Sequence, residues 1–183
     1  MQQQNDWYTG IDYFQSYKEQ DIQVEEQSIA QPMPLTRHER VELWYVLEGD
    51  GDMRVNGISH SVQQDSFLCL YAHHLYEISC VRKPLRILRI QFYIGLFMHA
   101  MWEKHPRGRN ASLVYETPAC LHCADREVLR LFLQARQEFS GNAFGSRNML
   151  MYIVLQIHML FCRYALQESI CLLYTSPSPR DCS

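Results

Sequence analysis

A chain of 183 residues is long enough for one ordinary domain with a sizeable core. Hydrophobic residues make up 47% of the chain and charged residues 20%, which is a globular composition. The formal net charge of -3 provides no basic field, so we do not expect these residues to bind nucleic acid directly. The opening MQQQNDWYTG lacks the features of a signal peptide, and no apolar stretch has the length of a membrane span. We therefore expect a soluble, cytoplasmic protein with no membrane segment.

The first segment, residues 1–35, is polar and rich in glutamine, with Pro32 and Pro34 near its end. Aromatic side chains are interspersed along it. This combination predicts an N-terminal arm that packs against the rest of the protein, and a lid is one hypothesis for its role.

Short β-rich runs separated by turn signals extend from residue 38 to residue 94. The run VELWYVLEG leads into Glu-Gly-Asp-Gly at 48–51, which predicts a tight hairpin, and Asn56-Gly57 predicts another. Three further runs, SFLCLY, HLYEISCV and PLRILRIQFYI, have the same character. Regular short strands of this kind predict a sandwich or barrel, which we assign to residues 36–96.

After Gly95 the hydrophobic period becomes that of helices, and we assign residues 97–170 to a helical region. Apolar residues predict one helix from Asp125 to Phe139 and a second from Ser146 to about Gln167. The second helix carries a broad apolar stripe that could pack on the first helix, on the barrel or on a second subunit. We predict a homodimer in which this stripe is the dimerisation surface: Leu150, Ile153, Val154, Ile157, Leu160 and Phe161.

The seven cysteines are scattered at spacings that fit reduced, buried thiols. One pair forms the CxxC sequence Cys120-Leu-His-Cys123, with His122 inside it. A single CxxC without a second pair is a weak signal for zinc or redox chemistry. We therefore expect no cofactor.

Three segments, HERVELWYVLEGDGDMRVNG, QQDSFLCLYAHHLYEI and LRILRIQF, resemble the N-terminal cupin domain of the arabinose-operon (AraC) family of bacterial transcription regulators. The best-matching element has the spacing of the first cupin motif: His38, three residues, Glu42, six residues, Gly49. The resemblance covers residues 30–168. It implies mainly β structure plus α, with a cupin-type (double-stranded β-helix or jelly-roll) barrel followed by a helical hairpin. It also implies a small effector in the barrel, dimerisation through the hairpin, and a helix-turn-helix domain that binds DNA.

Enzymatic cupins hold a divalent metal with the histidines and glutamate of the first motif and a later histidine. In this chain Thr36 stands at the first histidine position, which leaves His38, Glu42 and His74 as weak metal candidates. We therefore predict that the chain holds no metal and is not an enzyme. The alternative is a stand-alone cupin metalloenzyme, such as a sugar isomerase or a dioxygenase.

A binding role fits the same residues. Alternation places His38, Glu42 and Trp44 on one face of a strand, and the cupin resemblance implies that Glu42 points inward. An interior with an apolar stacking wall and several hydrogen-bonding groups suits a small polar ligand such as a sugar. For Trp44 a core position is an alternative, and for Arg89 a solvated strand position is one. The predicted ligand-binding residues are His38, Glu42, Trp44, Tyr71, His74 and Arg89.

The final residues, 171–183, read CLLYTSPSPRDCS. The string CLLYTSPSPRD is similar to the translation of a common transposon-end sequencing adaptor. We expect this tail to be a library artefact and the gene to be cut before its DNA-binding helix-turn-helix domain; the alternative is a natural Ser-Pro tail on a complete protein. The sequence therefore predicts the effector-binding and dimerisation part of an AraC-type regulator, which would reach DNA only through the missing domain.

Overall fold

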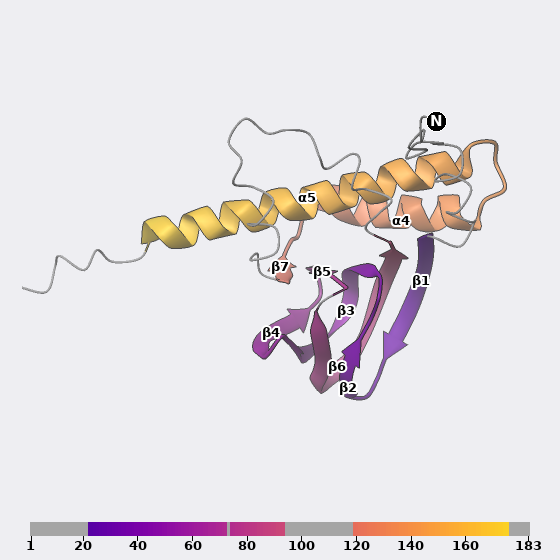
Figure 1. The fold of residues 1–183 in the computed structure, drawn as a ribbon. Coiled ribbons are helices and arrows are strands. Elements are labelled where there is room, and N and C mark those ends of the chain that lie inside the picture. Colours follow the sequence, from indigo (N-terminus) through magenta and orange to yellow (C-terminus); the bar gives the residue numbers. More distant parts are fainter. Residues whose placement is uncertain (1–21, 73, 94–118, 176–183) are drawn as a thin grey trace, which may run out of the picture.

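The computed structural model describes residues 22–72, 74–93 and 119–175, with side chains described as far as Gln167. The described part is an antiparallel β-barrel with a hairpin of two helices lying along one wall (Figure 1). The predicted fold class, a cupin-type barrel followed by a helical hairpin, is confirmed.

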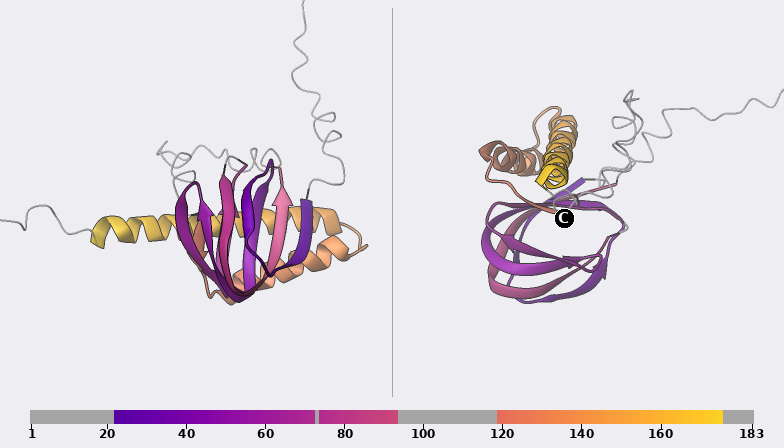
Figure 2. Two further views of the ribbon diagram at one scale, coloured as in Figure 1. Left: turned by 90° about the horizontal axis from the view of Figure 1, so that it is seen from below. Right: turned by 90° about the vertical axis from the view of Figure 1, so that its left-hand side faces the viewer.

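One sheet of the described residues curves round to form the barrel (Figure 2). Its strand order is β1-β6-β3-β5-β7, and β2 also pairs with β6 while β4 pairs with β3. The two longest strands, β3 and β6, pair with each other from Val41 opposite Phe92 to Val55 opposite Tyr76. The strands are β1 (Ile22–Ile29), β2 (Met33–Arg37), β3 (Val41–Val55), β4 (Ile58–Gln63), β5 (Ser66–Leu70), β6 (Leu75–Phe92) and β7 (Cys120–His122).

Two turn predictions have opposite outcomes. The hairpin at Asn56-Gly57 is confirmed, because both residues have positive φ angles, 48° and 84°, as a type I′ turn requires. The hairpin predicted at 48–51 is wrong, because β3 runs through these residues with shifts of register against β6. Gly49 has a φ of +114°, and a Cβ there would lie 2.4 Å from the carbonyl oxygen of Pro84. The glycine therefore permits a bulge within a continuous strand.

The sheet begins inside the segment predicted as an N-terminal arm. Strand β1 pairs along its whole length with β6, from Ile22 opposite Phe92 to Ile29 opposite Leu85. One face of β1 carries Gln23, Glu25 and Gln27. Because this face is polar, the segment lacks the apolar pattern by which a strand is recognised in a sequence. Residues 1–21 of the predicted arm lie outside the described residues.

Alternation along the strands gives the barrel wall two apolar faces. Inside the barrel, Trp44, Val46 and Ile87 belong to one buried core. On the outer face, Tyr45 and Phe67 belong to a second core, which includes residues of both helices. The hairpin is therefore held to the barrel by a continuous hydrophobic interface.

The hairpin consists of α4 (Arg126–Ser140) and α5 (Ser146–Thr175). The Asp125 side chain caps α4 by accepting a hydrogen bond of 2.8 Å from the backbone N–H of Glu127. The predicted helix over 125–139 is confirmed, and the second helix continues to Thr175 instead of ending near Gln167. The segment Ser146–Gln167 has the length and apolar composition of a membrane span, but core helices of soluble proteins share these properties.

The stripe predicted as a dimerisation surface faces inward within one chain. Five of its six side chains are buried in the core between the hairpin and the sheet, and Leu160 packs partly buried against them. These six residues therefore form an internal core in this arrangement, and dimerisation itself stays a prediction. The side chains that the hairpin leaves exposed include Phe139, Met149, Tyr152 and Met159.

Candidate ligand-binding site

A buried carboxylate lies among the apolar side chains of the barrel interior. Glu42 on β3 is 1% exposed. Its Oε2 accepts a hydrogen bond of 2.8 Å from the indole N–H of Trp44, and its Oε1 accepts one of 2.6 Å from the Gln91 amide. Hydrogen bonds to an ionised acceptor offset part of the cost of taking the carboxylate out of water. Glu42 is therefore held in one position by its neighbours.

His38 lies beside this carboxylate and presents a buried nitrogen to the interior. Its Nδ1 is 2.5 Å from the carbonyl oxygen of Arg40 and 3.9 Å from Glu42 Oε1. A carbonyl oxygen only accepts, so Nδ1 is the donor, and in the uncharged ring Nε2 is then an acceptor. That Nε2 is buried and has no hydrogen-bond partner among the described residues. An unsatisfied buried acceptor costs about 1–3 kcal/mol, so this atom is a natural contact for a ligand.

The guanidinium of Arg89 lies between two carboxylates. Its Nε donates to Glu25 Oε1 at 2.7 Å, and its Nη2 donates to the same oxygen. Its Nη1 is 4.0 Å from Glu42 Oε2. The Arg89 side chain is 18% exposed, so it belongs to the interior face and not to a solvated strand face.

Aromatic rings form the wall next to these polar groups. Trp44 is 1% exposed and contacts Tyr76 edge to face, with ring centroids 5.5 Å apart. The Tyr76 ring also contacts the ring of His38, with centroids 5.4 Å apart. Burial raises the pKa of Tyr76 above its usual range, and the neighbouring charge of Glu42 adds to this effect. The Tyr76 hydroxyl therefore keeps its proton.

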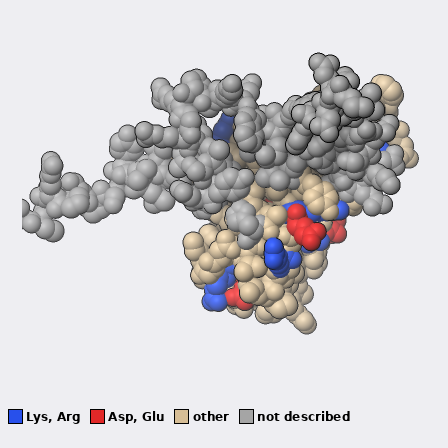
Figure 3. Space-filling view, in the orientation of Figure 1, with Lys and Arg blue, Asp and Glu red and all other residues tan. Residues whose placement is uncertain are grey.

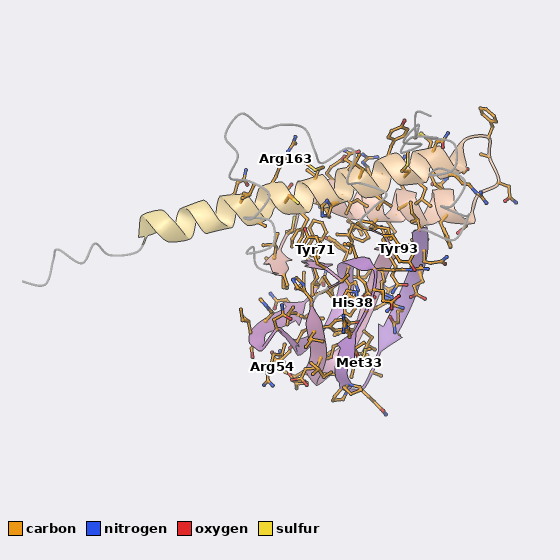
Figure 4. All side chains as sticks on the ribbon, viewed as in Figure 1. Met33, His38, Arg54, Tyr71, Tyr93 and Arg163 are labelled. Atoms are coloured by element: carbon orange, nitrogen blue, oxygen red, sulfur yellow. The ribbon has the colours of Figure 1, made fainter. Side chains whose placement is uncertain are left out.

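Four of the six predicted ligand-binding residues come together, namely His38, Glu42, Trp44 and Arg89. Tyr71 does not join them, because its hydroxyl lies 3.1 Å from Nε2 of His158 on α5 (Figure 4). Residues 68 and 70 of β5 face the interior, so residue 71 faces the hairpin. His74 does not join them either: its Nδ1 accepts a hydrogen bond of 3.2 Å from the backbone N–H of Tyr71.

The sequence reasoning missed three residues that contact the group: Glu25, Tyr76 and Gln91. Gln91 could have been found, because alternation from Arg89 places it on the same face. Glu25 could not, because its place depends on the register between β1 and β6.

The structure adds no support for a metal centre. Within the described ranges, no group of three or more His, Cys, Asp or Glu side chains is arranged to hold a metal ion. This applies to the weak candidates His38, Glu42 and His74, and to Cys120, His122 and Cys123 of the CxxC segment. Metal binding therefore stays untested as a property of the whole chain.

Comparison with known proteins gives matches in structure only. No protein-family model matches this sequence, and a search of curated proteins finds no match. A cupin protein from Bacteroides fragilis is 21% identical, over 41% of this chain and 68% of that one, with a TM-score of 0.38. A cupin superfamily protein from Desulfitobacterium hafniense DCB-2 is 15% identical, over 42% of this chain and 71% of that one, with a TM-score of 0.38. At these identities the likeness concerns the fold alone.

The prediction that the chain is not an enzyme is wrong, because it excluded catalysis and the fold does not. It was based on the incomplete metal motif, but structures with this fold include enzymes. Salicylate 1,2-dioxygenase from Pseudoaminobacter salicylatoxidans is 11% identical, over 39% of this chain and 20% of that one, with a TM-score of 0.36. The fold therefore does not settle whether this chain catalyses a reaction.

Proposed function

We propose that this chain is the sensing part of an AraC-type transcription regulator. It binds a small polar effector inside the barrel, and binding changes the position of the helical hairpin. The observation that carries the proposal is the interior group of His38, Glu42 and Arg89. A buried carboxylate, a largely buried guanidinium and an unpartnered ring nitrogen lie together beside an aromatic wall. Ligand sites combine an apolar lining with a few polar groups in this way.

Strand β1 provides a physical route from the interior to the hairpin. Glu25 points inward and pairs with Arg89, while the next residue, Glu26, pairs with Arg136 on α4. Successive residues of a strand face opposite sides, so the two ion pairs lie on the two sides of one wall. A ligand that alters the Arg89 contacts would alter the setting of β1 and the contact with α4. It shifts the hairpin only if it binds one arrangement better than the other.

We also propose that two copies associate through the outward face of the hairpin. Four exposed apolar side chains, Phe139, Met149, Tyr152 and Met159, support this. Sedimentation velocity of the purified chain tests it, because a dimer should dissociate on dilution and a monomer should not change.

DNA binding in the resembled family comes from a helix-turn-helix domain. On the described part of the face in Figure 3, acidic and basic side chains lie next to each other on the barrel. Paired charges of this kind do not make the basic surface that nucleic acid requires. Sequencing genomic DNA across codon 171 from an independent library tests whether a basic helix-turn-helix segment follows in frame.

A ligand screen tests the effector site. We expect at least one small polar compound from a broad library to raise the Tm of the chain, since a ligand of the folded state stabilises it. Arg89→Gln should weaken that compound by about tenfold or more. NMR of the same mixtures would detect whether the chain converts the compound into a product, a possibility that the fold leaves open.

The matched control is Arg54→Gln. Arg54 is also a strand arginine paired with a glutamate, Glu77, at 2.8 Å, but it lies on the outer surface with 49% of its side chain exposed. This variant should bind the compound as the wild type does. Equal loss in both variants, or a library without a single hit, would refute an interior effector site.

A further inference from the structure

Two buried polar atoms in the barrel lack a hydrogen-bond partner among the described residues, and Nε2 of His38 is an acceptor in the uncharged ring. The first is Nε2 of His38, whose side chain is 9% exposed. The second is Oε1 of Gln27, which also has no hydrogen-bond partner among the described residues. Gln27 lies opposite Ile87, a residue of the interior core, so the two share the interior face. Both atoms would be satisfied by a ligand that donates hydrogen bonds, and neither by one that only accepts them.

The charges next to His38 disfavour an anion. Glu25 and Glu42 carry two negative charges and Arg89 one positive charge, so this trio has a net charge of -1 (+1 - 2). The Arg89 guanidinium is already paired with Glu25 through both Nε and Nη2. An anionic ligand would either replace Glu25 or approach Nη1 of Arg89, which is 4.0 Å from Glu42 Oε2, and in both places it would lie close to the Glu42 carboxylate. Bringing like charges together in this way disfavours binding.

A hydroxyl group does not compete with Glu25 for Arg89 and is not repelled by Glu42. It can donate to His38 Nε2, and its own oxygen needs no cation.

We infer that Glu25 is a selectivity residue of the barrel interior: it keeps anionic ligands out and leaves the site to uncharged ligands that donate hydrogen bonds. This inference rests on the proposed effector site and deepens it. Glu25 acts through Arg89: by occupying the guanidinium it removes the one charged group of the trio that would attract a carboxylate or a phosphate.

The test compares two probes of the same carbon skeleton, glycerol and glycerate. The readout is the NMR resonance of His38 Nε2 in the full chain labelled with ¹⁵N-histidine, assigned by its loss in His38→Gln. We expect glycerol to shift this resonance in the wild type and glycerate to need an about tenfold higher concentration, or more, for the same shift. The exposed His122 on β7 serves as the internal control for effects of the solvent.

Glu25→Gln should remove the preference for glycerol over glycerate. With Arg89 released, glycerate should shift His38 at an about tenfold lower concentration than in the wild type, while the response to glycerol stays within about twofold. Glu25 is 48% exposed, so the substitution leaves the core intact. The matched control Glu77→Gln releases Arg54 on the outer surface and should leave both responses at His38 unchanged.

Each other outcome overturns the inference. If glycerate shifts His38 as readily as glycerol does in the wild type, the selectivity is wrong, yet an interior effector site survives. If neither probe shifts His38, the unpartnered acceptor does not take a donor. The effector screen with Arg89→Gln decides separately whether the proposed function fails too.

Discussion

The two faces of the barrel wall each bury a histidine, but in different surroundings. His38 on the interior face lies beside Glu42. His158 on the hairpin side contacts the Tyr71 hydroxyl at 3.1 Å and packs its ring against Phe92. Burial lowers the pKa of His158 to about 4. The same alternation of side chains thus produces a polar group that suits a ligand on one face and a packed core on the other.

The largest expected effect comes from breaking the packed face. Phe132 on α4 is fully buried, and its ring contacts those of Tyr45 and Phe67, with centroids 5.6 and 5.8 Å away. Phe132→Ala should lower the free energy of unfolding by about 3–5 kcal/mol, measured by chemical denaturation. The control is Leu133→Ala on the same helix, where the side chain is 39% exposed and the loss should be below about 1 kcal/mol. Similar losses in both variants would mean that the hairpin does not dock as described.

Acid should weaken the same face through His158. Its pKa in the folded chain is about 4, below the ordinary value of 6.5, so the unfolded chain takes up the proton first as the pH falls. Stability should therefore be lost between about pH 6.5 and pH 4, by at most about 3 kcal/mol from this residue. Denaturation at a series of pH values measures it.

The same series separates His158 from the carboxylates that titrate at low pH. His158→Gln should lose less stability than the wild type over this range. His122→Gln, which changes an exposed histidine, should follow the wild type. If the stability of His158→Gln falls with pH in parallel with that of the wild type, protonation of His158 does not destabilise the folded chain.

The smallest effect is expected on the polar face. Gln91→Ala removes the amide that donates a hydrogen bond to Glu42 Oε1 and should lower the free energy of unfolding by about 1–3 kcal/mol. Gln63→Ala, at an exposed position of β4, should have almost no effect. A Gln91→Ala variant as stable as Gln63→Ala would indicate that water reaches Glu42 and replaces the amide, which would make the interior group less buried than described.

Local signals in the sequence were sufficient for several elements. The Asn56-Gly57 turn follows from two residues that tolerate positive φ, and the helix after Asp125 follows from its capping side chain and its period. The cupin spacing of His38, Glu42 and Gly49 gave the fold class. For the turn and the helix the deciding interactions lie within a few residues along the chain.

Other elements depended on contacts between distant segments. Gly49 and Gly51 look like a turn in the sequence, but close approach to β6 makes them part of a bulge. Tyr71 looked like a ligand-binding residue, but its place after β5 turns it toward α5.

The sequence by itself determined which side chains share a face, because alternation is a property of each strand alone. It grouped Glu42 and Trp44, and it set the apolar stripe of α5, but His38, predicted on the same strand, lies in the link between β2 and β3. Only the tertiary structure decided which face points into the barrel and which strands lie side by side. Glu25 and Arg89 meet across 64 positions of sequence, and their pairing is fixed by the register of β1 on β6. That register depends on burial summed over the whole sheet, which no short stretch of sequence contains.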